Sequence, residues 1–156
     1  MRGKTLLGSI ICGLTVIAFH LAAATTPSLA GSWQFTLTPT APQAAAIPGL
    51  ATFTTDGSAI ETDGSELVPI RLGTPGHGIW QIANTPSTLY VQYISLIVNP
   101  DGSLYARNVT TMFVALNSAG NQFEGSYTIV QEIGASTTIV SSGTVSGQLI
   151  PHVPLP

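Results

Sequence analysis

The chain has 156 residues, of which 44% are hydrophobic and only 7% are charged, with 16 glycines and 11 prolines. This length fits a single domain, and high hydrophobicity combined with low charge excludes an intrinsically disordered chain. The Ala/Glu/Lys/Leu/Arg periodicity of a coiled coil is also absent.

Residues 1–30 have the features of a secretory signal peptide. A positive start at Arg2 and Lys4 precedes an apolar run, and small residues follow it. Two cleavage positions fit the small-x-small rule, one after Ala24 and one after Ala30. The alternative is an uncleaved anchor, because the apolar run is nearly long enough to cross a bilayer. Cleavage predicts a secreted or periplasmic protein that has no stable membrane span.

Cleavage leaves a domain over residues 31–150 and a proline-rich tail over residues 151–156. This remaining chain has two cations, Arg71 and Arg107, against seven anions, so its net charge is −5. Nucleic acids and anionic membrane surfaces are therefore unsuitable partners, since binding to them needs clustered Lys and Arg. The remaining chain also lacks cysteine, which excludes disulfides, thiolate catalysis and zinc sites of the Cys type.

Beyond the signal segment, apolar and polar residues alternate between Gly, Asn-Pro and Asp-Gly turns, a pattern that predicts β-strands. Short connections between consecutive long strands favour an up-and-down antiparallel sheet. We expect primed turns at the Asp-Gly pairs, because both residues tolerate a positive φ. The eight predicted strands are Ser32–Thr38, Leu50–Thr55, Ser58–Glu61, Gly78–Ala83, Thr88–Val98, Ser103–Leu116, Gln122–Ile133 and Thr137–Ile150.

The segment Pro39–Gly49 separates the first two predicted strands and contains three prolines. Proline has no backbone N–H to donate to a strand ladder, so we expect a stiffened loop here. The loop either covers the mouth of a barrel as a lid or serves as a surface connector.

Alternation within the later strands predicts which side chains face inward. In Gln122–Ile133 the inward set is expected to contain Phe123, Tyr127 and Gln131. Ser103–Leu116 leaves two alternatives, with Arg107 either inside the barrel or outside in a surface ion pair. Thr88–Val98 is apolar on both faces, so its outer face needs a cover, and we expect self-association through this strand.

Two motifs carry a resemblance to known proteins. Gly31-Ser32-Trp33 on the first strand, followed by a strand meander, resembles the lipocalin-like (calycin-type) β-barrel. Pro75-Gly76-His77-Gly78-Ile79-Trp80 resembles a recurrent motif of uncharacterised secreted bacterial proteins. The resemblance implies an all-β, closed, eight-stranded antiparallel barrel around a small hydrophobic ligand. Eight strands enclose a lumen that is either filled by side chains or holds one small molecule.

If the lumen holds a ligand, the residues expected to contact it are Trp33, Trp80, Tyr105, Arg107, Phe113, Phe123, Tyr127 and Gln131. A protein that binds a small hydrophobic molecule is the first functional class. The second is a barrel cyclase or isomerase resembling allene oxide cyclase, and the third is a non-catalytic surface or matrix module. The sequence leaves open whether any reaction is catalysed.

For a reaction, the candidate acids and bases are His77, Arg107, Tyr127 and Glu132. The three Asp-Gly-Ser tripeptides are interpreted as turns, because calcium loops need several oxygen ligands at fixed spacing. The sequence contains no nucleophile elbow, phosphate-binding loop or dinucleotide fingerprint. It therefore predicts neither a metal nor a cofactor.

Overall fold

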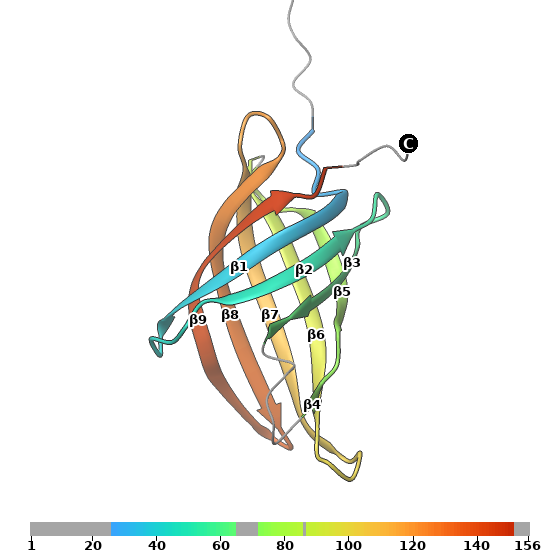
Figure 1. Ribbon diagram of the computed structural model, residues 1–156, viewed down its shortest axis with the longest axis vertical. Helices are drawn as coiled ribbons and strands as arrows, with labels where there is room; N and C mark the ends of the chain where they lie inside the picture. Colours follow the sequence, from blue (N-terminus) through green and yellow to red (C-terminus); the bar gives the residue numbers. More distant parts are fainter. Residues whose placement is uncertain (1–25, 65–71, 86, 152–156) are drawn as a thin grey trace, which may run out of the picture.

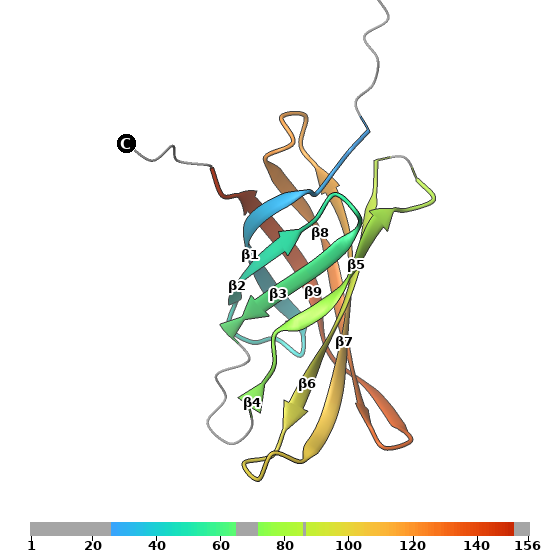
Figure 2. The same cartoon turned by 90° about the vertical axis from the view of Figure 1, so that its right-hand side faces the viewer.

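A computed structural model describes residues 26–64, 72–85 and 87–151 of the chain. Within these residues, nine β-strands form one antiparallel sheet that closes on itself through the pairing of β6 with β7 (Figures 1 and 2). The strands are β1 (Gly31–Ala41), β2 (Ile47–Phe53), β3 (Ser58–Asp63), β4 (Leu72–Gly73), β5 (Gly76–Ile82), β6 (Leu89–Val98), β7 (Leu104–Leu116), β8 (Gln122–Ile133) and β9 (Ser136–Leu149). The predicted all-β barrel is thereby confirmed.

The barrel has eight strands around its circumference, because β4 and β5 pair with the same edge of β6. The two pieces are separated at Thr74 and Pro75. The backbone N–H of Thr74 donates to the Leu96 carbonyl over 2.9 Å, and the Leu96 N–H donates to the Thr74 hydroxyl over 3.0 Å. A side chain thus accepts one ladder hydrogen bond at the point where the strand is interrupted.

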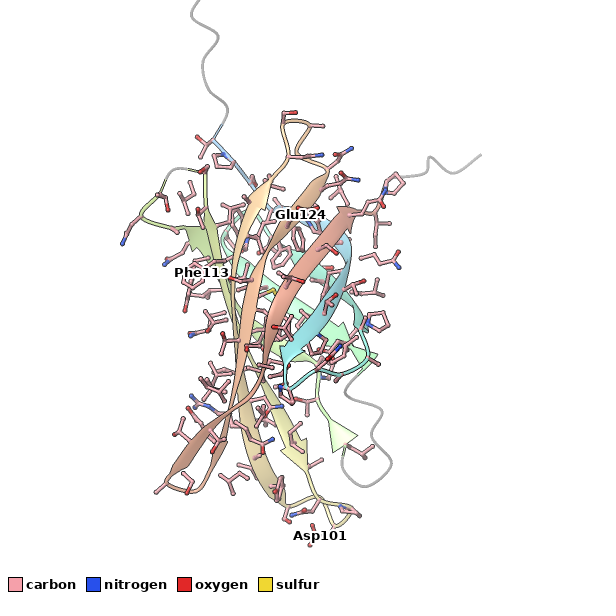
Figure 3. The ribbon with its side chains drawn as sticks, turned by 90° about the vertical axis from the view of Figure 1, so that its left-hand side faces the viewer. Asp101, Phe113 and Glu124 are labelled. Atoms are coloured by element: carbon pink, nitrogen blue, oxygen red, sulfur yellow. The ribbon has the colours of Figure 1, made fainter. Side chains whose placement is uncertain are left out.

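The hairpin turns lie where the sequence predicts them, but the primed type expected at Asp-Gly is wrong. Among the described residues only glycines have a positive φ, for example 92° at Gly57. The Gly57 N–H donates to the Thr54 carbonyl over 3.2 Å, and the Thr54 N–H donates to the Ser58 carbonyl over 3.0 Å. This is a type I turn followed by a left-handed glycine, the usual three-residue hairpin loop. The same loop closes β6 onto β7 at Asp101, which marks the hairpin tip in Figure 3.

The loop expected over Pro39–Gly49 is also wrong, since both strands extend into it. Pro39 lies within β1 and pairs with β9, and Pro48 lies within β2 and pairs with β1. A proline removes only one ladder donor, and the missing donor at Pro39 coincides with an irregularity in the β1–β9 register. Residues 42–46 remain as an exposed turn between β1 and β2, which matches a surface connector.

Apolar side chains fill the end of the barrel at which the chain enters β1. Trp33 and Phe123 pack with their ring centroids 5.1 Å apart. Fully buried Leu29 lies before the first strand, and its carbonyl accepts a hydrogen bond of 2.7 Å from the Trp33 indole N–H. A Cβ atom added to Gly147 would lie 2.3 Å from the Phe123 ring, so the ring occupies the space that a side chain would need. The buried core comprises Leu29, Trp33, Phe35, Leu37, Ala51, Phe53, Ala59, Leu89, Val91, Tyr93, Met112, Val114, Phe123, Tyr127 and Val145.

Burial decides which face of each later strand points inward. On β8 the inward set that begins at Phe123 and includes Tyr127 is confirmed. On β7 the other alternation faces inward, since Thr110 and Met112 are buried while Phe113 is 48% exposed. The placement of Arg107 and Phe113 in the lumen is therefore wrong.

Arg107 instead forms the surface ion pair that the sequence allowed as its alternative. The Nε atom of Arg107 lies 3.0 Å from Oε2 of Glu132, on the neighbouring strand β8, and both side chains are partly exposed. A pair in this setting contributes little stability, because water screens both charges.

The predicted signal peptide falls outside the described residues up to position 25, and the tail falls outside from position 152. Among the described residues, no helix has the length and apolar character that a membrane crossing requires.

Candidate functional site

Three polar side chains point into the barrel near its middle, and together they form what we call the inner polar cluster: Glu61 on β3, Tyr93 on β6 and Thr110 on β7. All three are buried, Glu61 with 4% and Tyr93 with 3% of its surface exposed. Tyr93 and Thr110 are directly paired across β6 and β7. Carboxylate, phenol and alcohol groups therefore meet inside the barrel.

The cluster lies inside because β3 and the middle of β2 point small and acidic residues inward and large aliphatic residues outward. Ala51 and Ala59 are buried, whereas Leu50 is 51% and Ile60 is 49% exposed. The inward positions are small because the neighbouring strand contributes large rings, as at Trp33, which pairs directly with Ala51. This arrangement leaves space for the longer Glu61 side chain at the next inward position of β3.

Gly76 on β5 brings the carboxylate and the phenol together. It pairs with Glu61, and a Cβ atom added to Gly76 would lie 2.3 Å from Glu61 Oε1 and 2.6 Å from Tyr93 Cδ2. Both side chains therefore pack against the same backbone position, where any residue larger than glycine would displace one of them.

The pKa of the Tyr93 phenol is raised well above its ordinary value. Burial is the largest cause, because it disfavours the phenolate, and the negative charges of Glu61 and Asp63 act in the same direction. The hydroxyl of Thr110 has a smaller, opposite effect. The phenol is thus a neutral hydrogen-bond donor, and its oxygen has no partner at ordinary geometry within the described part of the chain.

Further polar pairs continue from the cluster along the inner faces of β7, β8 and β9. The Tyr127 hydroxyl and the Ser141 hydroxyl are 2.9 Å apart, and the Gln131 side-chain amide donates to Asn108 over 3.1 Å. Ile129 lies between these pairs on β8 and is only partly buried. This half of the interior is therefore more polar and more accessible than the end filled by aromatic rings.

The structure brings together about half of the residues predicted to contact a ligand. Trp33, Phe123, Tyr127 and Gln131 face the interior. Trp80 is partly buried against the core, with its indole N–H donating to the Thr54 carbonyl over 2.8 Å. The remaining three do not line the interior in this way: Arg107 and Phe113 lie on the outer face, and Tyr105 is the extra residue of a register irregularity between β6 and β7.

The predicted acids and bases are more scattered. His77 is exposed on the outer face of β5, and Glu132 is occupied by its ion pair with Arg107. Tyr127 is the one that faces the interior. Sequence reasoning did not select Glu61 and Tyr93 for the interior. Glu61 alternates with Ile60, and the apolar residue is the expected inward one.

Nothing in the described ranges groups three or more His, Cys, Asp or Glu side chains as a metal site would. No protein-family model, curated protein or solved structure matches this chain. The resemblance to lipocalins therefore stands on the Gly-x-Trp motif and the closed eight-stranded barrel.

The inner polar cluster offers a ligand two complementary groups. The neutral Tyr93 phenol donates a hydrogen bond, and the Glu61 carboxylate accepts them. An uncharged head group that accepts a hydrogen bond, such as an alcohol, satisfies the Tyr93 donor, while an anionic head group is repelled by the Glu61 carboxylate.

Proposed function

We propose that this protein is an exported lipocalin-like barrel that binds one small, mainly hydrophobic molecule carrying a single polar head group. The buried Tyr93 phenol beside the Glu61 carboxylate, inside a closed barrel, supports this proposal most directly. A donor buried without a partner costs free energy, and a ligand head group that accepts its hydrogen bond removes that cost.

The filled end of the barrel limits where such a ligand binds. Aromatic and aliphatic side chains of the buried core, which includes Leu29 and Met112, occupy that end of the interior. We therefore propose that the ligand binds in the other half, between the inner polar cluster and the partly buried side chains of β7, β8 and β9. Ile97 and Ile129 supply apolar contacts there.

Native mass spectrometry of the protein purified from its host tests the proposal. We expect a co-purifying molecule of low mass, and displacement of the neutral fluorophore N-phenyl-1-naphthylamine when that molecule is added back. Tyr93→Phe should weaken binding about 3- to 10-fold, the usual effect of losing one neutral hydrogen bond. Tyr90→Phe removes a phenol from the outer face of β6 and is the matched control.

A barrel that carries no small molecule and binds no fluorophore would contradict the proposal. That result would favour the non-catalytic surface or matrix module, which needs a stably packed barrel and no ligand.

A barrel cyclase or isomerase is the second candidate, and the inward Glu61 carboxylate beside a neutral phenol favours it. Such a pair can take a proton from one carbon of a bound substrate and return one elsewhere. Isomerisation leaves the mass unchanged, so chromatography of extracted ligand distinguishes the two functions. An enzyme yields a different isomer from Glu61→Gln than from the unaltered protein, whereas a carrier yields the same molecule from both.

We also propose self-association through β6. Its outer face presents Ile94 and Leu96, and half-exposed Ile79 on β5 pairs with Gln92, the outward residue next to Ile94 on β6. Burying these side chains against a second copy removes apolar surface from water.

A further inference from the structure

The outer surface of the barrel changes character across β1, β9 and β8. Where Gln34–Thr38, Thr144–Gln148 and Gln122–Ser126 pair with one another, the side chains that point outward carry amides and hydroxyls, with one carboxylate. We call this surface the outer polar face. Its nine residues are Gln34, Thr36 and Thr38 on β1, Gln148, Ser146 and Thr144 on β9, and Gln122, Glu124 and Ser126 on β8.

The strand register arranges these side chains in three straight rows. Each row joins directly paired residues, and the first contains three glutamines: Gln34, Gln148 and Gln122. Neighbouring side chains in a row are about 4.8 Å apart, and successive rows are about 6.8 Å apart along the strands. The face therefore offers a regular grid of groups that each donate or accept hydrogen bonds.

The grid is hollowed rather than flat. Six of its side chains line a depression of about 330 Å³, with Phe123 and Gly147 completing the wall. A second depression of about 540 Å³ adjoins it and shares Glu124 and Ser146. Both volumes fall in the range typical of sites for small ligands.

A partly exposed aromatic pair borders the grid. Phe113 on β7 pairs with Ser126 at the edge of the face and packs on Tyr90, with ring centroids 5.4 Å apart. Figure 3 shows Glu124 on the near surface of the barrel and Phe113 at its margin. A ring in this position presents an apolar surface next to the hydrogen-bonding groups.

We propose that the outer polar face binds a neutral glycan chain. Side-chain amides and hydroxyls both donate and accept, as sugar hydroxyls do, so the two surfaces satisfy each other in many relative positions. The exposed Phe113 ring contacts the apolar C–H side of a sugar ring. Anionic chains are disfavoured, because Glu124 carries the one charge among the nine side chains and that charge is negative.

Binding of neutral oligosaccharides to the whole exported chain tests this assignment. The probes are cello-, xylo-, chito- and malto-oligosaccharides, followed by saturation-transfer NMR, with pull-down on insoluble cellulose and chitin. We expect at least one series to bind, with little dependence on salt, because no counterions are released from a neutral chain.

The double variant Gln34→Ala/Gln148→Ala removes two amides from the hollow and should weaken binding at least about tenfold, as expected for the loss of several hydrogen bonds. Gln81→Ala removes an exposed glutamine from β5, away from the face, and is the matched control. Tyr93→Phe should leave glycan binding unchanged, which separates this site from the barrel interior.

Three results would overturn the assignment. One is that no neutral oligosaccharide binds at millimolar concentration. Another is that binding persists in the double variant at its original strength. The third is binding that collapses with added salt, which would indicate a charged occupant.

Discussion

Leu29 and the Trp33 indole together close one end of the barrel, and shortening the chain from its N-terminus tests how much this closure contributes. A chain that begins at Thr25 retains the closure, whereas a chain that begins at Gly31 lacks both Leu29 and the carbonyl that accepts the indole hydrogen bond. These two starting points correspond to the two predicted cleavage positions.

The expected loss has two parts. The Leu29 side chain is fully buried, so Leu29→Ala should cost about 2–4 kcal/mol of unfolding free energy. Starting the chain at Gly31 also leaves the Trp33 N–H without its acceptor, which costs about 1–3 kcal/mol more. A loss of 3 kcal/mol lowers the urea midpoint by roughly 1–3 M.

Urea unfolding followed by tryptophan fluorescence measures these differences. A chain that begins at Ser28 is the control, because it keeps Leu29 and should match the chain that begins at Thr25. Equal midpoints for the chains starting at Thr25 and Gly31 would refute the reasoning. Because the chain that begins at Gly31 is expected to be the less stable one, we also expect cleavage after Ala24. Measuring the intact mass of the exported protein tests this expectation.

Three further predictions address other parts of the barrel. Gly78→Ala should lower stability by about 1–3 kcal/mol, because the added Cβ would lie 1.9 Å from the Gln92 carbonyl oxygen. The control is Gly64→Ala, whose added Cβ meets nothing nearer than 3.6 Å and should leave stability unchanged. Chemical denaturation compares the two variants. The raised pKa of Tyr93 predicts that the free energy of unfolding falls as the pH rises above about 10, because only the unfolded chain then loses the phenol proton. Tyr93→Phe should flatten this dependence of stability on pH. An unchanged slope in the variant would count against a buried, neutral Tyr93 phenol. Leu96→Glu should abolish self-association measured by light scattering, and a protein that is monomeric at tens of micromolar before substitution would contradict the proposed contact.

Local patterns in the sequence determined the architecture. Alternating residues and Gly-containing turns predicted strands that match the observed ones closely, because period-2 alternation and turn chemistry act within a few residues. The type of hairpin turn was harder to predict from the sequence, because a primed turn and a type I turn with a glycine bulge differ in the φ of Asp56. The same locality explains the error at Pro39, where the strand continues through proline at a shift in the β1–β9 register.

The tertiary structure alone decided what faces the interior. Alternation separates two faces of a strand, but only the neighbouring strands determine which of them is buried. On β7 the face that carries the aromatic residues points outward, so Arg107 and Phe113 lie outside the barrel. On β3 the acidic residue Glu61 is buried and Ile60 is exposed, because large rings from β1 and β2 already occupy the apolar volume. The candidate site therefore follows from how side-chain volumes fill the closed barrel, a property shared by eight strands and absent from any one of them.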